Sequence, residues 1–355
     1  MSLPWAQQPP PPGGIERSSQ SVAILFEKGN YAELNFGGFK PEVSGLVAGV
    51  LPSGDMAGDY GTYSLGYKQA LTEKLDFAVV LENALGANVD YAAGTGYPIA
   101  GSTATISNAS LTAMLRYKLP ENFSVYGGLR VLRTKGKVFL PAVASYRMEA
   151  DAQTDLGYLV GVAWEKPEIA ARVALTYNSK ITHDFDARES SLLTAGAFIN
   201  TNFETVIPES VNLEFQTGVA KDTLLFGSVR WVHWSQFDIT PTHYSATLGQ
   251  GSLVDYTENT TTYSLGVGRR FNDKWSGVVS LGYEKHTGTP TGNLGPTDGF
   301  RSIGLAAVYQ ATENVKITGG VRYVDIGNAV TNPPISGAFE DNSGWGAGFR
   351  VGINF

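Results

Sequence analysis

The stretch that decides the fold is WGAGFRVGINF, residues 345–355, at the end of the chain. Every second side chain in it is apolar, and the apolar set consists of Trp345, Ala347, Phe349, Val351, Ile353 and Phe355. Alternation with a period of two is typical of a strand with one apolar and one polar face. The apolar faces of such strands either pack together in an interior or face lipid around a lumen.

The same alternation recurs along the chain. It is clear in FSVYGGLRV (123–131), VNLEFQTGV (211–219), TYSLGVG (262–268), WSGVVSLGY (275–283) and VKITGGVRY (315–323). The opposite face of these stretches carries arginine, lysine, glutamate, asparagine, serine and glycine. The pattern therefore predicts an all-β protein made of many amphipathic strands.

The connections between the strands alternate in length. Short polar turns such as YKLPENF, RFNDKW and YQATENV alternate with long segments rich in glycine, proline and small polar residues, at 41–59, 86–102, 184–203, 237–255, 287–299 and 326–341. This alternation is typical of an up-and-down barrel with tight turns at one rim and loops at the other.

Counting these segments predicts about fourteen strands, an even number, as bacterial barrels require. Pro208 cannot lie within a ladder, so we expect the eighth strand to begin near Glu209. The expected spans are 31–41, 60–69, 75–83, 103–118, 122–138, 148–165, 170–183, 205–219, 222–236, 256–270, 274–286, 300–310, 314–325 and 342–355.

Aromatic residues fall at two heights of this barrel. Tyr67, Tyr117, Trp164, Trp275, Tyr309 and Phe355 lie near the short turns, whereas Tyr63, Trp231, Tyr263, Tyr283, Tyr323 and Trp345 lie towards the long loops. Two aromatic girdles around an aliphatic band match the two interfaces of a bilayer. We therefore predict a transmembrane antiparallel β-barrel whose apolar faces contact lipid.

Composition excludes several other classes. Charged residues make up 17% of the 355 residues, below the ~25% of an average soluble domain. No apolar run is long enough for a transmembrane helix. The net charge of −7 and the absence of a basic stripe argue against nucleic acid. The chain has no cysteine, its four histidines lack metal-ligand spacing, and no G-x-S-x-G motif is present, so we expect no enzyme and no cofactor.

The first residues, MSLPWAQQPPPPGGIERSS, lack the basic and apolar regions of a signal peptide. Because a barrel of this kind belongs in a bacterial outer membrane, we expect that a leader has been removed. Membrane lipid or lipopolysaccharide would surround the barrel, which we expect to be a monomer.

The polar face of each strand should enclose a lumen. A charge on the lipid face would cost ~2–4 kcal/mol at the bilayer midplane, so strand parity predicts that the arginines point inward. One interpretation is a mutually paired network, and the other is that one or two of them bind an anionic head group. The residues concerned are Glu214 and the candidates Arg116, Arg130, Arg172, Arg230, Arg322 and Arg350.

Two of the long loops are apolar, although loops are normally polar. SGLVAGVLPSG contains Leu46, Val47 and Leu51, and SLLTAGAFIN contains Leu192, Leu193, Phe198 and Ile199. Such loops either fold against their neighbours or capture a hydrophobic ligand at the external rim. THDFDA, residues 182–187, gathers one histidine and two aspartates, and we interpret it as a polar cluster at a loop edge.

The chain resembles the FadL/TodX group of outer-membrane transporters for long-chain fatty acids and other hydrophobic compounds. In LTYNSKITHDFDA, the residues Tyr177, Ser179, Ile181 and His183 match a strand motif of the group, with Asn178 in place of its usual arginine. IPESVNLEF is similar to the stretch that leads into the group's next strand. The likeness also rests on the strand count and on the segment before the first strand, and it covers nearly the whole chain.

The resemblance implies a fourteen-stranded barrel, residues 31–355, with residues 1–30 folded back inside it as a hatch. It implies ligand capture by external loops, a lumen pocket and lateral release at an inward kink of the third strand. Here the kink would fall at Glu82, Asn83 and Gly86. Two features differ from the group: Glu27, Lys28 and Gly29 stand where its hatch carries Asn-Pro-Ala, and the proline near the kink is absent.

We therefore expect a passive channel for hydrophobic molecules such as long-chain fatty acids. Two alternatives stay open at this point. A polar-solute porin would have a wet lumen lined by arginine and glutamate, and a structural or adhesin barrel would have a sealed lumen.

Overall fold

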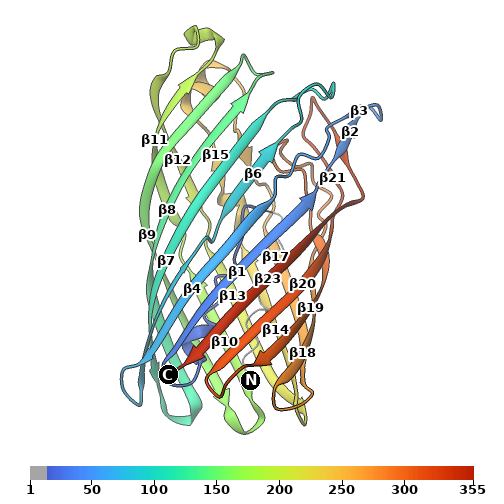
Figure 1. The fold of residues 1–355 in the computed structure, drawn as a ribbon. Helices are drawn as coiled ribbons and strands as arrows, with labels where there is room; N and C mark the ends of the chain where they lie inside the picture. Colours follow the sequence, from blue (N-terminus) through green and yellow to red (C-terminus); the bar gives the residue numbers. More distant parts are fainter. Residues whose placement is uncertain (1–13) are drawn as a thin grey trace.

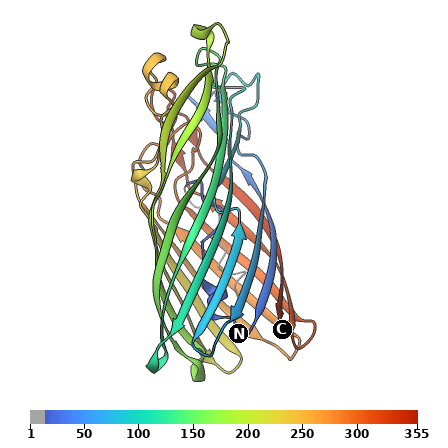
Figure 2. The ribbon, with the colours of Figure 1, turned by 90° about the vertical axis from the view of Figure 1, so that its left-hand side faces the viewer.

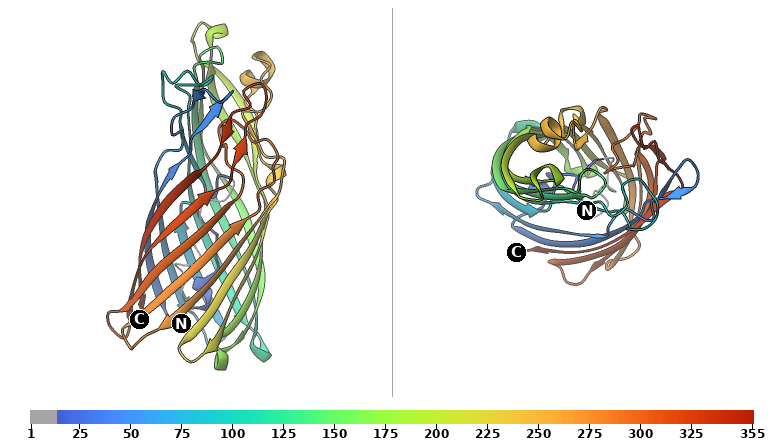
Figure 3. Two further views of the ribbon diagram at one scale, coloured as in Figure 1. Left: turned by 90° about the vertical axis from the view of Figure 1, so that its right-hand side faces the viewer. Right: turned by 90° about the horizontal axis from the view of Figure 1, so that it is seen from above.

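The computed structural model describes residues 14–355. Fourteen antiparallel strands form a closed ring around a lumen (Figures 1 and 3). The ring closes where β1 (Tyr31–Glu42) pairs with β23 (Asn342–Asn354), from Tyr31↔Asn354 to Glu42↔Ser343. The predicted up-and-down barrel is confirmed.

Eleven of the strands are continuous and three are interrupted. The continuous strands besides β1 and β23 are β4 (Tyr60–Ala70), β7 (Thr103–Lys118), β8 (Phe123–Leu140), β9 (Tyr146–Lys166), β14 (Thr223–Val232), β17 (Thr260–Arg270), β18 (Trp275–Glu284), β19 (Phe300–Gln310) and β20 (Val315–Ile326). The third strand consists of β5 (Leu75–Glu82) and β6 (Gly86–Asp90), the seventh of β10 (Ala171–Asn178) and β11 (Ile181–Ser190), and the eighth of β12 (Ile199–Ile207) and β13 (Ser210–Ala220).

The connections form the two rims. Short turns, including η3 (Pro120–Asn122) and η4 (Pro167–Ile169), make the short-turn rim, at which β23 ends. The loop rim carries a small sheet of β2 (Gly45–Val47), β3 (Leu51–Pro52), β21 (Ala329–Val330) and β22 (Ala338–Phe339), the pair β15 (Asp238–Ile239) and β16 (Val254–Asp255), and the short helices η5 (Leu192–Thr194), η6 (Trp234–Gln236) and η7 (His243–Thr247). No helix within residues 14–355 is long and apolar enough to cross a membrane.

Three predicted boundaries are wrong. The sequence predicts a loop at 86–102, but β6 continues the third strand to Asp90. The other two concern the segment 184–203. It was expected to be a loop, but β11 continues to Ser190 and β12 begins at Ile199, so the eighth strand starts well before Glu209. Pro208 interrupts this strand instead of starting it. The hairpin rises above the rest of the barrel (Figure 2), so its outward residues, such as Asp184 and Asp186, meet water and look like loop residues in the sequence.

The two faces of the wall have the predicted chemistry. Outward side chains such as Val279, Leu281 and Leu305 are exposed on the apolar belt, whereas Ser280 between them is buried in the lumen. The aromatic residues pair within their girdles, with ring centroids 4.8 Å apart for Trp275–Tyr309 and 6.1 Å for Tyr67–Phe355 near the short turns. Tyr263–Tyr283 and Tyr323–Trp345 pair at 6.3 and 5.1 Å at the other height.

A charge at the middle of the apolar belt should therefore destabilise the barrel strongly. Val279 lies midway between Trp275 and Tyr283 on β18, and we expect Val279→Arg to cost ~2–4 kcal/mol of unfolding free energy in phospholipid vesicles. Val219→Arg, next to a short turn, should cost at most ~1 kcal/mol because the charge reaches the interface. Equal costs in urea unfolding would contradict the assignment of the outward face to lipid.

Candidate functional site

Residues 14–30 lie within the ring, and we call this segment the plug. At its upper end it pairs with the third strand, because Arg17 N donates to Ala84 O at 2.8 Å and Gly86 N donates to Ile15 O at 2.7 Å. Lower down it forms the short helix η2 (Ala23–Phe26), visible inside the ring in Figure 1. Ala23, Ile24 and Leu25 of this helix are buried. The hatch expected over 1–30 thus lies partly outside the described residues, and its described part occupies the lumen.

Lumen charges hold the upper half of the plug. Arg230 on β14 binds the carboxylate of Glu16 through two nitrogens, with Nε at 3.1 Å from Oε2, and both side chains are buried. Arg130 on β8 donates to Gln20 Oε1. A buried charge is tolerated when it is paired and hydrogen-bonded, so each arginine and its plug partner depend on each other.

Two lumen carboxylates accept hydrogen bonds from plug serines. Ser18 Oγ donates to Glu82 Oε2, and Ser21 Oγ donates to Glu214 Oε1, each at 2.5 Å. The main chain contributes too, because Asn212 Nδ2 donates to Ser19 O at 3.0 Å. Neutral hydroxyls, charged groups and backbone therefore all fasten this segment to the inner wall.

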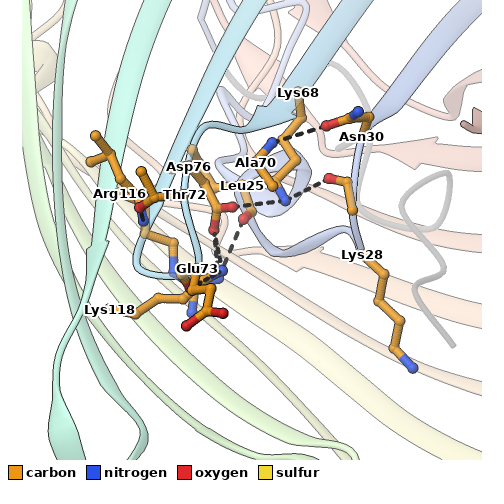
Figure 4. Close-up of polar contacts among 12 residues, drawn as sticks. Leu25, Lys28, Asn30, Lys68, Ala70, Thr72, Glu73, Asp76, Arg116 and Lys118 are labelled. Atoms are coloured by element: carbon orange, nitrogen blue, oxygen red, sulfur yellow. Dashed lines mark hydrogen bonds and ion pairs between the residues drawn. The ribbon is translucent and has the colours of Figure 1, made fainter.

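A buried polar cluster holds the lower end of the plug (Figure 4). Asp76 on β5 forms ion pairs with Lys68 Nζ and Lys118 Nζ, both at 3.0 Å. Lys68 Nζ also donates to Gly29 O at 2.8 Å, and Arg116 Nη1 donates to Leu25 O at 3.3 Å. The cluster links two wall strands, β4 and β5, to the turn between η2 and β1.

Phe26 is clamped between two arginines. The guanidinium carbons of Arg116 and Arg172 lie 4.3 and 4.6 Å from its ring centroid, and Tyr126 meets it edge to face at 6.1 Å. Cation–π contacts strengthen when the groups are shielded from water, as these are. The phenyl ring thus fixes η2 to strands β7, β8 and β10.

The structure places five of the six head-group candidates in this network. The plug is contacted by Arg116, Arg130, Arg172 and Arg230. Arg350 binds Tyr31 and Glu33 at the start of β1, where the chain leaves the plug. Arg322 lies half-buried on β20. The paired network expected from parity is thus present, while head-group binding stays a prediction.

The residues Glu27, Lys28 and Gly29 form the turn that joins the plug to β1. Gly29 has φ +59°, a left-handed conformation that glycine adopts at little cost. Lys28 O accepts a hydrogen bond from Asn354 Nδ2 at 2.9 Å. The turn is therefore tied to the last strand at the short-turn rim.

An apolar cavity of about 80 Å³ lies above the plug. Ile15 contributes to its floor, inward residues of β11 and β12 form one wall, and loop residues cover it. A second cavity of about 140 Å³ shares part of its lining and reaches towards β1 and β4. Side chains lining the first cavity include Val89, Ile106, Met148, Phe185, Phe203, Ile207, Phe237, Ile239, Leu253 and Tyr256.

Tyr256 lies between the two cavities and lines both. Burial raises the pKa of its phenol, because the charged form would lose its hydration. The ring packs with Trp234 and Phe237 at centroid distances of 5.1 and 5.4 Å. Phe237 and Tyr256 of this loop cluster line the first cavity, and Tyr256 alone lines the second.

The wall itself is irregular beside the second cavity. Between Glu82 and Gly86 the third strand turns inward and pairs with the plug, which leaves the neighbouring edge of β4 partly uncovered. Asparagine side chains compensate: Tyr63 N donates to Asn83 Oδ1 at 2.9 Å and Asn88 Nδ2 donates to Asp59 O at 3.1 Å.

An arginine of the plug fills the space behind this edge. The Arg17 guanidinium lies over the Tyr60 ring at 4.1 Å and against Gly86. A Cβ at residue 86 would lie 2.6 Å from Arg17 Nε, so a larger residue there would displace the end of the Arg17 side chain. Of the predicted gate residues, Glu82 and Gly86 therefore meet the plug and Asn83 bonds to β4, and their role as a gate stays a prediction.

The apolar loop residues do not line either cavity. Leu192 and Leu193 are 68% and 66% exposed, and Leu46, Leu51, Phe198 and Ile199 are also exposed, with Val47 half-buried. Sequence reasoning missed the cavity residues of β11 and β12. Their signal was the alternation in 181–190 and 199–207, where the apolar positions point inward because the wall has risen above the membrane belt.

The predicted polar cluster at THDFDA separates across the wall. His183 is buried, whereas Asp184 and Asp186 point outward and are exposed. Among residues 14–355, no three histidine, cysteine or acidic side chains are grouped so that they could hold a metal ion.

Comparison with known proteins agrees with this geometry. Residues 53–335 match the model of the family described as outer membrane protein transport protein (OMPP1/FadL/TodX). A search of curated proteins found no match.

Solved structures share the fold. A FadL homologue of Pseudomonas aeruginosa has a TM-score of 0.78 at 16% identity, covering 94% of this chain and 92% of that one. The Pseudomonas putida toluene transporter TodX has a TM-score of 0.67 at 12% identity, covering 97% of each chain. The Ralstonia pickettii toluene transporter TbuX has a TM-score of 0.65 at 12% identity, covering 94% of this chain and 91% of that one.

Loss of Arg230 should loosen the plug. Arg230→Ala leaves Glu16 buried without its partner, which costs ~3–5 kcal/mol locally, so the upper plug should detach. We expect higher single-channel conductance in planar bilayers. Arg301→Ala, on the outer face of β19, serves as the control and should leave conductance unchanged. Equal conductance of the two variants would show that the ion pair does not hold the plug.

Proposed function

The chain belongs to the OMPP1/FadL/TodX family of outer membrane transport proteins, and we propose that it is a passive channel for hydrophobic small molecules in a bacterial outer membrane. The apolar cavity enclosed by the wall above the plug carries this proposal. No nucleotide-binding motif or other energy source is found in the sequence. Transfer would follow the ligand's own gradient.

Apolar burial supplies the affinity. Moving a ligand from water into a cavity lined by phenylalanine, isoleucine and methionine yields ~0.8 kcal/mol per CH₂. The exposed loop residues Leu192, Leu193, Phe198 and Ile199, with Leu46, Val47 and Leu51, would make the first contact with the ligand. The cavity would then receive it as the more enclosed site.

The charge of the ligand decides what must move. An uncharged molecule meets a lining that is mostly apolar, in which the other residues include three threonines, Tyr256, Lys135, Lys137 and Asp255. A fatty acid also needs a cation for its carboxylate, and Arg130 and Arg230 below the floor are held by Gln20 and Glu16. We propose that fatty acids bind these arginines only when the plug shifts, whereas uncharged compounds bind without that shift.

Release would occur sideways at the third strand. The inward turn at 83–85 leaves an edge closed by side chains, and the second cavity reaches it. Withdrawal of Arg17 from Tyr60 would open this edge to the membrane. The missing Asn-Pro-Ala motif does not prevent this, because the plug contacts the kink through residues 15–17.

The alternatives make different demands on the lumen. A porin for polar solutes needs an open wet passage, but the plug and its charge network occupy the lumen of this barrel. A structural or adhesin barrel needs no apolar cavity. The family's role in transport accords with a non-catalytic function, and we propose a monomer surrounded by lipid or lipopolysaccharide.

Two assays test the proposal. The first is liposome swelling with sugars, and the second is uptake of a labelled long-chain fatty acid and of uncharged N-phenyl-1-naphthylamine by cells that produce the protein. We expect uptake of at least one hydrophobic probe and no swelling. Swelling without uptake would establish the porin instead, and movement of no solute would favour the structural barrel.

Filling the cavity should block uptake without unfolding the barrel. Ala150 lines it, and Ala150→Phe should lower the initial rate of N-phenyl-1-naphthylamine uptake at least fivefold, at a stability cost of ~1–3 kcal/mol. Ala113→Phe faces lipid and is the control. An unaltered rate in a folded Ala150→Phe barrel would remove the cavity from the pathway.

Bridging the third-strand edge should trap ligand inside. Thr62→Cys with Ala84→Cys places two thiols across it, in a chain that otherwise has no cysteine. After bridging by a short bifunctional methanethiosulfonate, we expect delivery to the cell interior to fall while binding to the protein persists. Delivery at the unbridged rate would rule out release at this edge.

A further inference from the structure

The barrel wall is interrupted a second time, between β9 and β11. β9 pairs with β10 from Lys166 to Leu159 and with β11 only over Arg147–Ala150. Residues 151–158 and 179–186 face each other between these pairings. No strand pairing forms over this stretch; at its lower end Ser179 N donates to Tyr158 O and Tyr158 N donates to Ser179 Oγ, both at 2.9 Å. We call this stretch the β9–β11 seam.

The seam arises because the two strands change face at different heights. On β9 the residues that point into the lumen have even numbers up to Ala150 and odd numbers from Leu159 onward. Between these residues the register of β9 with β8 shifts by one residue, near Gly136. The seventh strand changes from even to odd inward positions at Ser179–Lys180. One extra residue moves every following side chain to the other face, so hydrogen-bonding groups between the two changes are out of phase.

The ladder between the seventh and eighth strands shows the contrast. The eighth strand changes face at Pro208–Glu209, directly opposite Ser179–Lys180. Because these two changes are level, β11 and β12 stay paired from Ile181↔Ile207 to Glu189↔Ile199. The ladder between β9 and β11 opens because their two changes of face are offset.

Side chains close the β9–β11 seam in place of backbone. His183 is fully buried, with Nδ1 at 2.6 Å from Asp155 Oδ2 and Nε2 at 3.2 Å from Thr134 Oγ1. Gln153 Nε2 donates across the seam to Asp184 O at 2.7 Å. These contacts can break one at a time, whereas a ladder must be unzipped cooperatively.

The lower end of the seam lies near the aromatic girdle on the long-loop side, because Tyr177 pairs with Val211 and Val211 pairs with Trp231 of that girdle. This lower end is the Tyr158–Tyr177 pair, with ring centroids 6.2 Å apart, and Asp184 and Asp186 point outward beside it. Unbonded backbone groups are not tolerated against hydrocarbon, so the seam belongs to the head-group layer and the water above it. A hydrophobic molecule that gathers at the membrane surface would meet the barrel here.

The apolar cavity lies directly behind the seam. Thr134, Ala150 and Phe185, which flank the seam, all line the cavity. Its 80 Å³ is smaller than the roughly 150 Å³ of a cavity known to hold benzene, so a ligand must move part of the wall. The wall yields most easily where ladder hydrogen bonds, worth ~1 kcal/mol each, are missing.

We propose that the β9–β11 seam is a side entrance through which uncharged hydrophobic molecules pass from the head-group layer into the apolar cavity. His183 is the latch of this entrance, meaning that its contacts with Asp155 and Thr134 hold the seam closed. This rests on the proposed transport function. It concerns uptake and is separate from release at the third strand.

A reversible bridge across the seam tests the proposal. In the full chain, Gln153→Cys with Asp184→Cys is bridged by a short bifunctional methanethiosulfonate, and N-phenyl-1-naphthylamine uptake by cells is measured. We expect the bridge to lower the initial rate at least fivefold and a reductant to restore it. Arg133→Cys with Thr154→Cys, which are paired across the intact β8–β9 ladder, is the matched control and should not change the rate.

The outcomes separate the two proposals. If the unbridged protein takes up neither this probe nor a labelled fatty acid, the transport function itself fails. If it takes up the probe and bridging leaves the rate unchanged, only the side entrance is overturned.

A second measurement examines the latch. Spin labels at 153 and 184 should show a longer or broader distance distribution in His183→Ala than in wild type, and labels at 133 and 154 should not. Unchanged distances in a folded His183→Ala barrel would overturn the role of His183. If this variant does not fold, the bridging result on the histidine-containing protein still decides the entrance.

Discussion

Backbone polar groups that meet hydrocarbon have to be bonded within the wall, and this constraint organises the barrel. It requires the first strand to pair with the last, from Tyr31↔Asn354 onward, so that the ring has no edge in the membrane. It also restricts where the wall can be irregular. The third strand turns inward next to Tyr63 of the girdle on the long-loop side. The β9–β11 seam begins at Tyr158 and Tyr177, and Tyr177 lies two strands from Trp231 of the same girdle. Above that height, water and side chains can satisfy what the ladder does not.

The lumen has a polar lower layer and an apolar upper layer, because buried polar groups need partners. Below, arginines and carboxylates from the wall meet a plug whose own groups pair with them, because a charge buried without a partner costs several kcal/mol. Above, the wall leaves the bilayer and its apolar side chains turn inward, which creates a mostly apolar cavity over Ile15. A polar layer that fills the lumen beneath an apolar cavity suits the proposed channel for hydrophobic molecules better than a porin.

The two irregular parts of the wall are closed by different means. At the third strand, asparagine side chains and an arginine of the plug cover the edge of β4, so this closure is tied to the plug. At the β9–β11 seam, the wall closes itself through His183, Asp155 and Gln153. On the proposed function, the edge at the third strand responds to the plug, whereas the β9–β11 seam does not. Release at the third strand and uptake at the seam would therefore be controlled independently.

The sequence by itself determined the strand count, the two girdles and the inward direction of the arginines, because a period of two and the bilayer's fixed thickness leave little choice in local pattern. It also located the interruption at Glu82–Gly86 through the family resemblance, although not the function of that interruption. It did not reveal the tall hairpin of β11 and β12, the partners of each arginine or the cavity. The arginines find their partners on a plug that is distant from them in the chain, and the cavity forms where inward side chains of several strands meet loop residues. Both arrangements exist only once the ring has closed.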